Sequence, residues 1–279
     1  MKRLTLLAMT ASALLTAGAT IAVGSATAAS STLPTLSLTL TKSSITVAGA
    51  TQSGAVNVVT TATGVKEAGV ILFLLKPGAT FEVVEAAIQK AHGDTNVTSK
   101  YGSLVFDAEV TPGQSSEVQT YLQPGQYVAV VPGEEGKGSR AHALFTVTAA
   151  ASPVALPAPE ATIRSIEFGF QGPSTLHDGE LVRFENEGFL IHMDVAAPVK
   201  NMKAAKQVVK DLLTGKEKAL EKLISGPPAP FAGPLSHEAF QQETITAKPG
   251  IYVEVCFMDT QDHRSHSQLG MERIIKIVK

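Results

Sequence analysis

The sequence predicts an all-β protein of two tandem Greek-key β-sandwich domains, each with a short inserted helix. Three observations support this fold class: short segments rich in Val, Ile, Thr and Phe, turn signals between them, and an order of segments that occurs twice. Segments such as 56–60 and 181–185 alternate between apolar and polar residues, and pairs such as Pro112-Gly113 and Asp178-Gly179 separate them. Many short strands separated in this way are typical of a sandwich or barrel.

The two halves of the chain carry the same series of signals. A Pro-Gly turn leads into an alternating strand, with Tyr at the same place, over 124–131 and again over 249–256. Upstream, the apolar run 69–73 lies opposite 188–192. A shared order of this length indicates a duplicated domain. An amphipathic stretch follows each upstream run and predicts one helix per half: Phe81 to Lys90 and Lys203 to Leu213.

The N-terminus predicts a signal peptide over residues 1–28. Lys2 and Arg3 precede an apolar stretch, and Ala26-Thr27-Ala28 gives the small residues that signal peptidase needs. No basic stop-transfer flank follows, so we expect no transmembrane anchor after cleavage. The mature protein is expected to be secreted or extracytoplasmic, in the periplasm or cell envelope.

A stretch of alanines and prolines divides the mature chain. Its composition predicts an extended linker over 149–161. The linker separates a first domain at 31–148 from a second at 162–279. The formal net charge of the whole chain is −2 and no sustained basic run occurs, so nucleic acid is not an expected partner.

The chain has one cysteine, Cys256. In an exported protein a leftover cysteine is a buried inert thiol, half of an intermolecular disulfide, or a metal thiolate. A small buried side chain on a strand is the simplest of these. The residues around Cys256 favour the metal thiolate.

Four side chains of the second half form a candidate copper site. Cys256 ends a strand, His266 lies in the following loop, and Met271 begins the next strand. His192, expected on a neighbouring strand, would complete the set. Two His and one Cys with a weak axial Met serve both oxidation states of copper. His263 is the alternative to His266, and the shorter gap to Met271 favours His266.

The second half resembles the cupredoxins, the blue-copper proteins that include plastocyanin and halocyanin. The resemblance is carried by Asn186-x-Gly188-Phe189 before His192, by Pro249-Gly250-x-Tyr252 before Cys256, and by the spacing of His266 and Met271. It implies that His192, Cys256 and His266 are equatorial ligands of one type 1 copper ion, with Met271 axial. Met193 departs from the family pattern, because plastocyanin-like proteins often have there an Asn that ties the ligand loops together.

The first half is expected to be a degenerate cupredoxin-like domain without copper ligands. In the alignment of the two halves, Phe73 stands opposite His192 and Val131 stands opposite Cys256. Apolar side chains would then fill the place of the metal.

The resemblance implies an exported type 1 copper-binding protein that carries one electron at a time and meets a redox partner protein. The alternative is a copper-free structural or binding module of the cell envelope, in which Cys256 and His192 are core residues. No His-x-His pair and no hydrolase motif occurs in the sequence. We therefore expect no enzyme activity.

Overall fold

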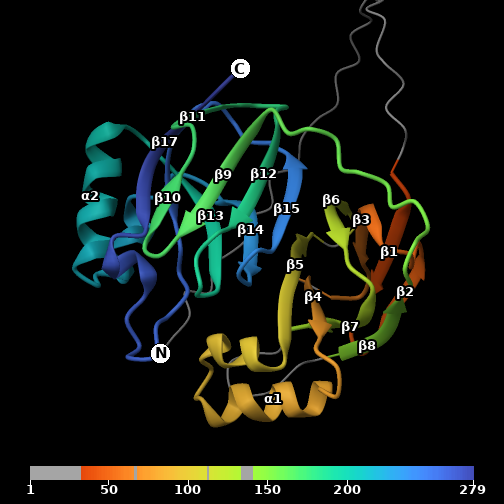
Figure 1. Cartoon of the computed structure of the whole chain (residues 1–279). Helices are drawn as coiled ribbons and strands as arrows, with labels where there is room; N and C mark the ends of the chain where they lie inside the picture. The colour runs from red at the N-terminus through yellow and green to blue at the C-terminus, as the bar shows by residue number, and fades with distance from the viewer. Residues whose placement is uncertain (1–32, 66–67, 112, 133–140) are drawn as a thin grey trace, which may run out of the picture.

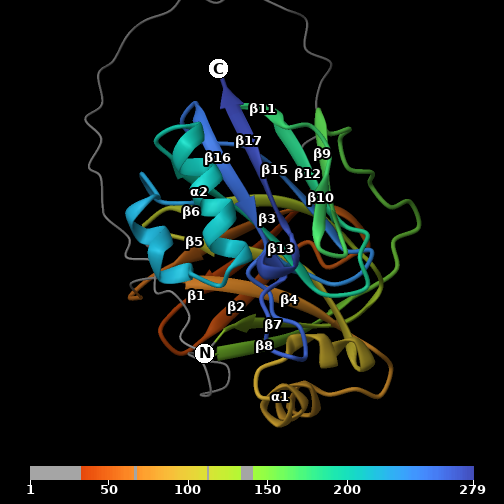
Figure 2. The same ribbon diagram turned by 90° about the vertical axis from the view of Figure 1, so that its left-hand side faces the viewer.

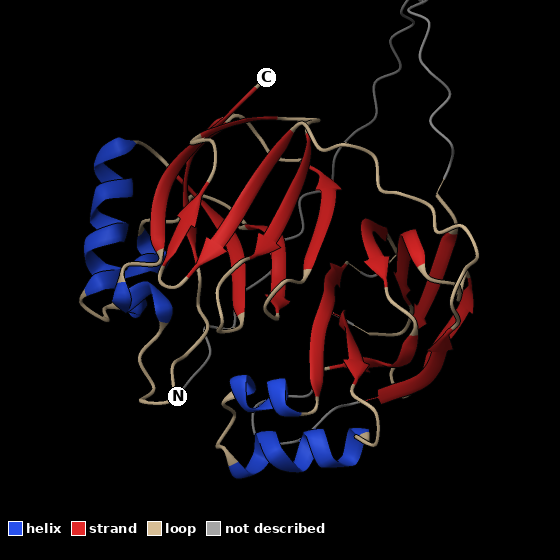
Figure 3. Ribbon diagram, viewed as in Figure 1, coloured by secondary structure: helices blue, strands red, loops and turns tan. Residues whose placement is uncertain are grey.

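The structure is a computed structural model that describes residues 33–65, 68–111, 113–132 and 141–279. Strands dominate both halves and each half adds a helix (Figure 3), which confirms the predicted class of tandem β-sandwich domains. The predicted signal peptide lies outside the described residues. Within those ranges, no helix is long and apolar enough to cross a membrane.

The first domain contains two sheets around one apolar core. Strands β2-β1-β3-β6 make one face, and β5-β4-β7-β8 make the other. Leu38, Leu72, Phe106 and Tyr127 are fully buried between them. The elements are β1 (Thr35–Leu40), β2 (Ile45–Gly49), β3 (Gly54–Ala62), β4 (Ala68–Leu75), α1 (Phe81–Lys90), η1 (Thr95–Lys100), β5 (Gly102–Val110), β6 (Ser115–Leu122), β7 (Gly125–Val131) and β8 (Ala141–Val147).

The second domain repeats this order with one added strand. Strands β10-β9-β12-β15 face the sheet β11-β17-β16-β13-β14. The elements are β9 (Ala161–Ile166), β10 (Gly169–Gln171), β11 (Thr175–His177), β12 (Leu181–Asn186), β13 (His192–Val199), α2 (Met202–Leu213), η2 (Glu217–Lys222), β14 (Ala229–Leu235), β15 (Phe240–Thr244), β16 (Gly250–Val255), η3 (His266–Leu269) and β17 (Glu272–Val278).

The two domains share a sheet. Strand β15 pairs antiparallel with β6, Gln241 opposite Thr120, so that four strands of each domain join into eight. Beside this seam, the Ser236 hydroxyl accepts a 2.8 Å hydrogen bond from the backbone N–H of Leu104. The domains therefore lie side by side and are joined along strand edges (Figure 1).

Both predicted helices form, and each begins at a capping side chain. The Thr80 hydroxyl accepts from the Val83 N–H at α1, and the Asn201 side chain accepts from the Ala204 N–H at α2. The apolar stripe of α2 packs against β16, and Figure 2 shows α2 in front of that strand, with α1 at the bottom of the view. Each helix lies in a connection between two strands and does not interrupt a sheet.

The strand register corrects the alignment of the two halves. Strand β4 pairs with β7 with Leu75 opposite Gln126, and β13 pairs with β16 with Val199 opposite Ile251. Counting back from Leu75 along β4 and from Val199 along β13 places Ala68 opposite His192. The expected equivalence of Phe73 with His192 is therefore wrong. The physical reason is that the apolar run before His192 is a loop, and strand β13 begins only at His192.

Candidate metal centre

Three of the four predicted ligands meet at one end of the second sandwich. His192 is the first residue of β13, Cys256 directly follows β16, and His266 opens η3. The Sγ atom of Cys256 lies 3.4 Å from His266 Nδ1 and 3.9 Å from His192 Nδ1. The two Nδ1 atoms are 3.0 Å apart. Pairing of β13 with β16 brings residues more than sixty positions apart to the same edge.

All three side chains are closed off from solvent: Cys256 and His266 are 0% exposed and His192 is 1% exposed. Burial raises the pKa of the Cys256 thiol to about 12. Burial lowers the pKa of His266 to about 4, and burial with the nearby His266 does the same for His192. Both imidazoles are thus neutral at neutral pH, which is the form that binds a metal.

The donor set fits a transition-metal ion. The Nε2 atoms of His192 and His266 have no hydrogen-bond partner among the described residues, and both rings turn Nδ1 toward the sulfur. The three ligand atoms all lie within 4.8 Å of one another. One thiol and two imidazole nitrogens suit a borderline-soft cation that accepts sulfur and nitrogen together.

Met271 lies beside this group through its backbone. Its N–H donates to the His266 carbonyl at 3.0 Å, and its own carbonyl accepts from the Cys256 N–H at 3.2 Å. The residue is fully buried and directly precedes β17. The loop from Cys256 to Met271 is therefore closed by hydrogen bonds between the candidate ligands themselves.

The competing histidine lies outside the cluster. His263 is exposed and has a positive φ of 62°, in the loop before η3. It does not belong to the group of converging ligand atoms, which contains His266.

The loop that delivers His192 is fixed by Asn186. Its side-chain amide donates to the carbonyls of Leu190 and Leu235 at 2.7 and 2.8 Å, and its oxygen accepts from the Gly188 N–H at 2.9 Å. Asn186 is 2% exposed, so these bonds are protected from water. Asn186 and Gly188 of the sequence motif thus hold the loop that leads to His192.

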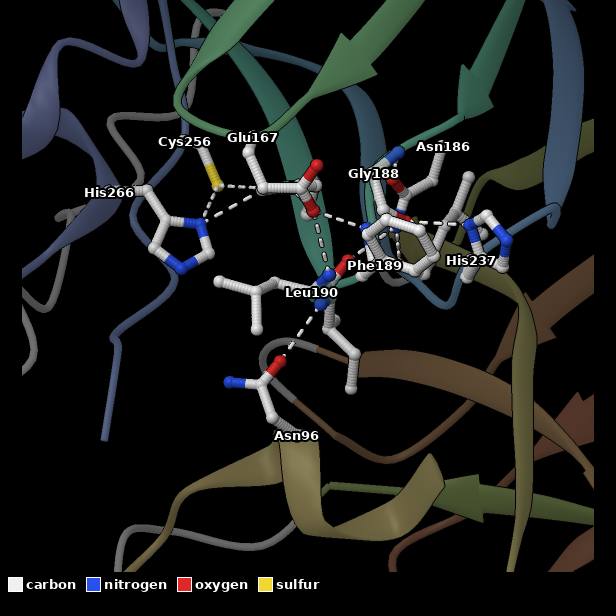
Figure 4. Close-up of polar contacts among 12 residues, drawn as sticks. Asn96, Glu167, Asn186, Gly188, Phe189, Leu190, His237, Cys256 and His266 are labelled. Atoms are coloured by element: carbon white, nitrogen blue, oxygen red, sulfur yellow. Dashed lines mark hydrogen bonds and ion pairs between the residues drawn. The ribbon is translucent and has the colours of Figure 1, made fainter. Parts of the chain in front are cut away.

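Glu167 lies close to the His192 ring, with its Oε1 atom 3.9 Å from His192 Nε2. The same oxygen accepts from the N–H groups of Phe189 and Leu190 (Figure 4). A Cβ at Gly188 would stand only 2.6 Å from His192 Nε2 and 2.8 Å from Glu167 Oε1. Glycine at 188 is thus what allows the carboxylate and the ring to approach.

Two further contacts complete the surroundings. The Met193 N–H points at Cys256 Sγ at 3.4 Å, a donor that would stabilise a thiolate. Phe168, partly exposed, packs edge-on against His266 with ring centroids 5.3 Å apart. The sulfur therefore has a backbone donor beside it, and the His266 ring has an aromatic neighbour.

A buried acidic pair lies close to the thiol. Glu254 is 0% exposed and forms an ion pair with Arg273, and Asp194 is 2% exposed. Burial, together with the neighbouring Glu254, raises the pKa of Asp194 well above its usual value. Arg273 pairs with the Glu254 carboxylate, and burial disfavours a second negative charge on Asp194.

Glu167 and Asn96 were not singled out from the sequence. Glu167 follows β9 in a turn, and Asn96 belongs to η1 of the other domain, where it hydrogen-bonds the Ile191 N–H. A lone Glu in a turn and a lone Asn in a short helix carry no pattern that marks a metal site.

No protein-family model matches the chain, and no curated protein matches it. Similar solved structures include auracyanin of Roseiflexus castenholzii, with 18% identity, 42% of this chain and 95% of that chain covered, and a TM-score of 0.26. A copper-containing nitrite reductase of Thermus scotoductus has 13% identity, and the match covers 88% of this chain and 68% of that chain with a TM-score of 0.25. A multicopper oxidase of Pseudomonas thermotolerans has 11% identity, and the match covers 88% of this chain and 67% of that chain with a TM-score of 0.23.

The resemblance to the cupredoxins that the sequence suggested agrees with the tandem β-sandwich fold and with the His–Cys–His cluster of the second domain. The expectation of no enzyme activity is contradicted, because the structures that match 88% of the chain are copper nitrite reductases and multicopper oxidases, which are enzymes. That expectation relied on the lack of His-x-His pairs and of hydrolase motifs in the sequence. At such identities, residue roles do not transfer.

Proposed function

We propose that the second domain holds one type 1 copper ion and passes single electrons to and from a redox partner protein. His192, Cys256 and His266 would hold the ion, and Met271 would be its fourth ligand. The observation that carries this proposal is the convergence of one buried sulfur and two buried Nδ1 atoms within 4.8 Å.

Copper suits these residues better than a hard cation does. A soft thiolate with two imidazoles favours copper or zinc over magnesium or calcium. Copper when bound supplies a one-electron change between its two oxidation states. The high pKa of Cys256 means that the thiol loses its proton only when a metal replaces it.

The protein's own part would be to hold the ligands still. Asn186 fixes the loop before His192, and the Met271 backbone ties the loop that runs from Cys256 to His266. Little rearrangement between oxidation states favours fast electron exchange. Partly exposed Phe168 contacts the buried His266 ring, so a partner docked over it would come within one side chain of the site.

The remaining parts of the proposal concern the whole chain. We infer a copper-free first domain over 31–148, a linker over 149–161 and the copper domain over 162–279. The corrected register supports this, because Ala68 and Val131 occupy the positions of His192 and Cys256. Export out of the cytoplasm rests on the N-terminal pattern of residues 1–28.

Copper loading of the purified full chain tests the proposal. We expect one copper per chain and an intense visible thiolate-to-Cu(II) band, lost in Cys256→Ala and in His266→Ala. His263→Ala is the matched control, an exposed histidine of the same loop, and should keep the band. A colourless chain that retains no copper would contradict the proposal and leave the copper-free envelope module.

A further inference from the structure

One side chain of the first domain is hydrogen-bonded to both loops that carry the candidate ligands. Asn96 Oδ1 accepts from the Ile191 N–H at 2.9 Å, and Asn96 Nδ2 donates to the Asp259 carbonyl at 3.3 Å. Ile191 directly precedes His192, and Asp259 lies three residues after Cys256. Figure 4 shows Asn96 reaching from η1 to the chain beside Leu190.

The amide of Asn96 is itself held in place. Asp94 caps η1, and its Oδ1 atom accepts from both the backbone N–H and the side-chain Nδ2 of Asn96, each at 2.9 Å. The side chain is thus oriented before it meets the second domain. A donor and an acceptor on one planar group then set the separation of the two loops.

Apolar contacts support the same two loops from the same side. Ile191 is 3% exposed and belongs to a cluster with Phe73, Phe81 and Val128 of the first domain. Met258, from the loop after Cys256, packs against that cluster as well. The loop before His192 and the loop after Cys256 therefore both rest on β4, β7 and α1 of the first domain.

We propose that the first domain is a support for the metal centre and that Asn96 is its positioning residue, which fixes the distance between the His192 loop and the Cys256 loop. This inference rests on the proposed copper function. It gives the first domain a task that needs no metal of its own. The two bonds of Asn96 limit how far the ligands can move apart when the charge on the site changes.

The test uses the full chain with Asn96→Ala and Asn96→Leu, the second of which keeps the side-chain volume while losing both bonds. Asn57→Ala is the matched control, since Asn57 on β3 contacts Glu117 within the first domain. Three quantities are measured: amide exchange at Ile191 in the metal-free protein, Cu(I) affinity by chelator competition, and the reduction potential.

We expect Ile191 exchange to rise and copper affinity to fall about tenfold in both Asn96 variants, the size expected from losing one or two hydrogen bonds. The reduction potential should shift in both, while Asn57→Ala matches the wild type. A potential and an affinity equal to those of the wild type would overturn the inference, even if the melting temperature fell. A wild-type chain without copper would instead overturn the proposed function, and this inference with it.

Discussion

Gly188→Ala is the substitution whose effect on the metal centre follows most directly from geometry. The new Cβ would lie 2.6 Å from His192 Nε2 and 2.9 Å from His192 Cδ2. Ordinary contact begins near 3.4 Å, so the imidazole must retreat by about 0.8 Å. Functional groups work only when held within about 0.5 Å of their productive positions. The displacement therefore exceeds what the proposed copper site would tolerate.

We expect Gly188→Ala to weaken copper binding at least tenfold and to lower the intensity of the visible band. The metal-free protein should lose about 1–3 kcal/mol of unfolding free energy, the usual result of overpacking a buried site. Thermal melts of the metal-free chain and chelator competition measure the two effects. Gly226→Ala is the control, because the nearest atom to its Cβ is a Pro198 carbon at 3.6 Å.

A Gly188→Ala chain with the melting temperature, copper affinity and spectrum of the wild type would refute this reasoning. It would mean that the His192 ring has room to move without loss. A fall in stability with an unchanged spectrum and copper affinity would refute the predicted displacement of His192, because the side chain of Glu167 would then have moved instead.

Two further predictions concern charge. Glu167→Gln should raise the reduction potential on the order of tens of millivolts by voltammetry, because a carboxylate 3.9 Å from His192 Nε2 favours the more positive Cu(II) state; an unchanged potential would argue against that contact. Burial, with Glu109 nearby, raises the pKa of Asp107 to about 8. The folded state thus keeps a proton that the unfolded chain releases near pH 4, so stability falls as pH rises from about 4 to about 8. Asp107→Asn should flatten that dependence and raise the free energy of unfolding by about 2 kcal/mol at pH 8 in denaturant titrations, a value reduced because the residue is only partly buried. Plots of unfolding free energy against pH that run parallel for the two proteins would contradict this.

Much of the fold could be predicted from local pattern. Alternating segments gave the strands, the stretch at 81–90 became α1, and that at 203–213 became α2 with one more residue at its start. These signals are local, since side-chain periodicity follows directly from helix and strand geometry. The convergence of Cys256, His192 and His266 could also be predicted, because their order and their places at strand ends follow the pattern of a copper site.

What could not be predicted depends on contacts between distant segments. The run before His192 is apolar like a strand, but it forms a loop whose backbone groups hydrogen-bond to Asn186 and Glu167. Treating that run as a strand shifted the alignment of the two halves. The bond from Asn96 to Asp259 joins residues 163 positions apart, and no periodicity records such a pair. The shared sheet through β6 and β15 is likewise set by strand edges meeting, which local sequence does not encode.

X-ray absorption at the copper edge of the loaded full chain tests the central claim most directly, because it reports the atoms around the ion. One sulfur neighbour at short distance with two imidazole nitrogens, and loss of the sulfur signal in Cys256→Ser, is the predicted result. A copper shell of nitrogen and oxygen only, or a sulfur signal that survives in Cys256→Ser, would contradict the site at His192, Cys256 and His266.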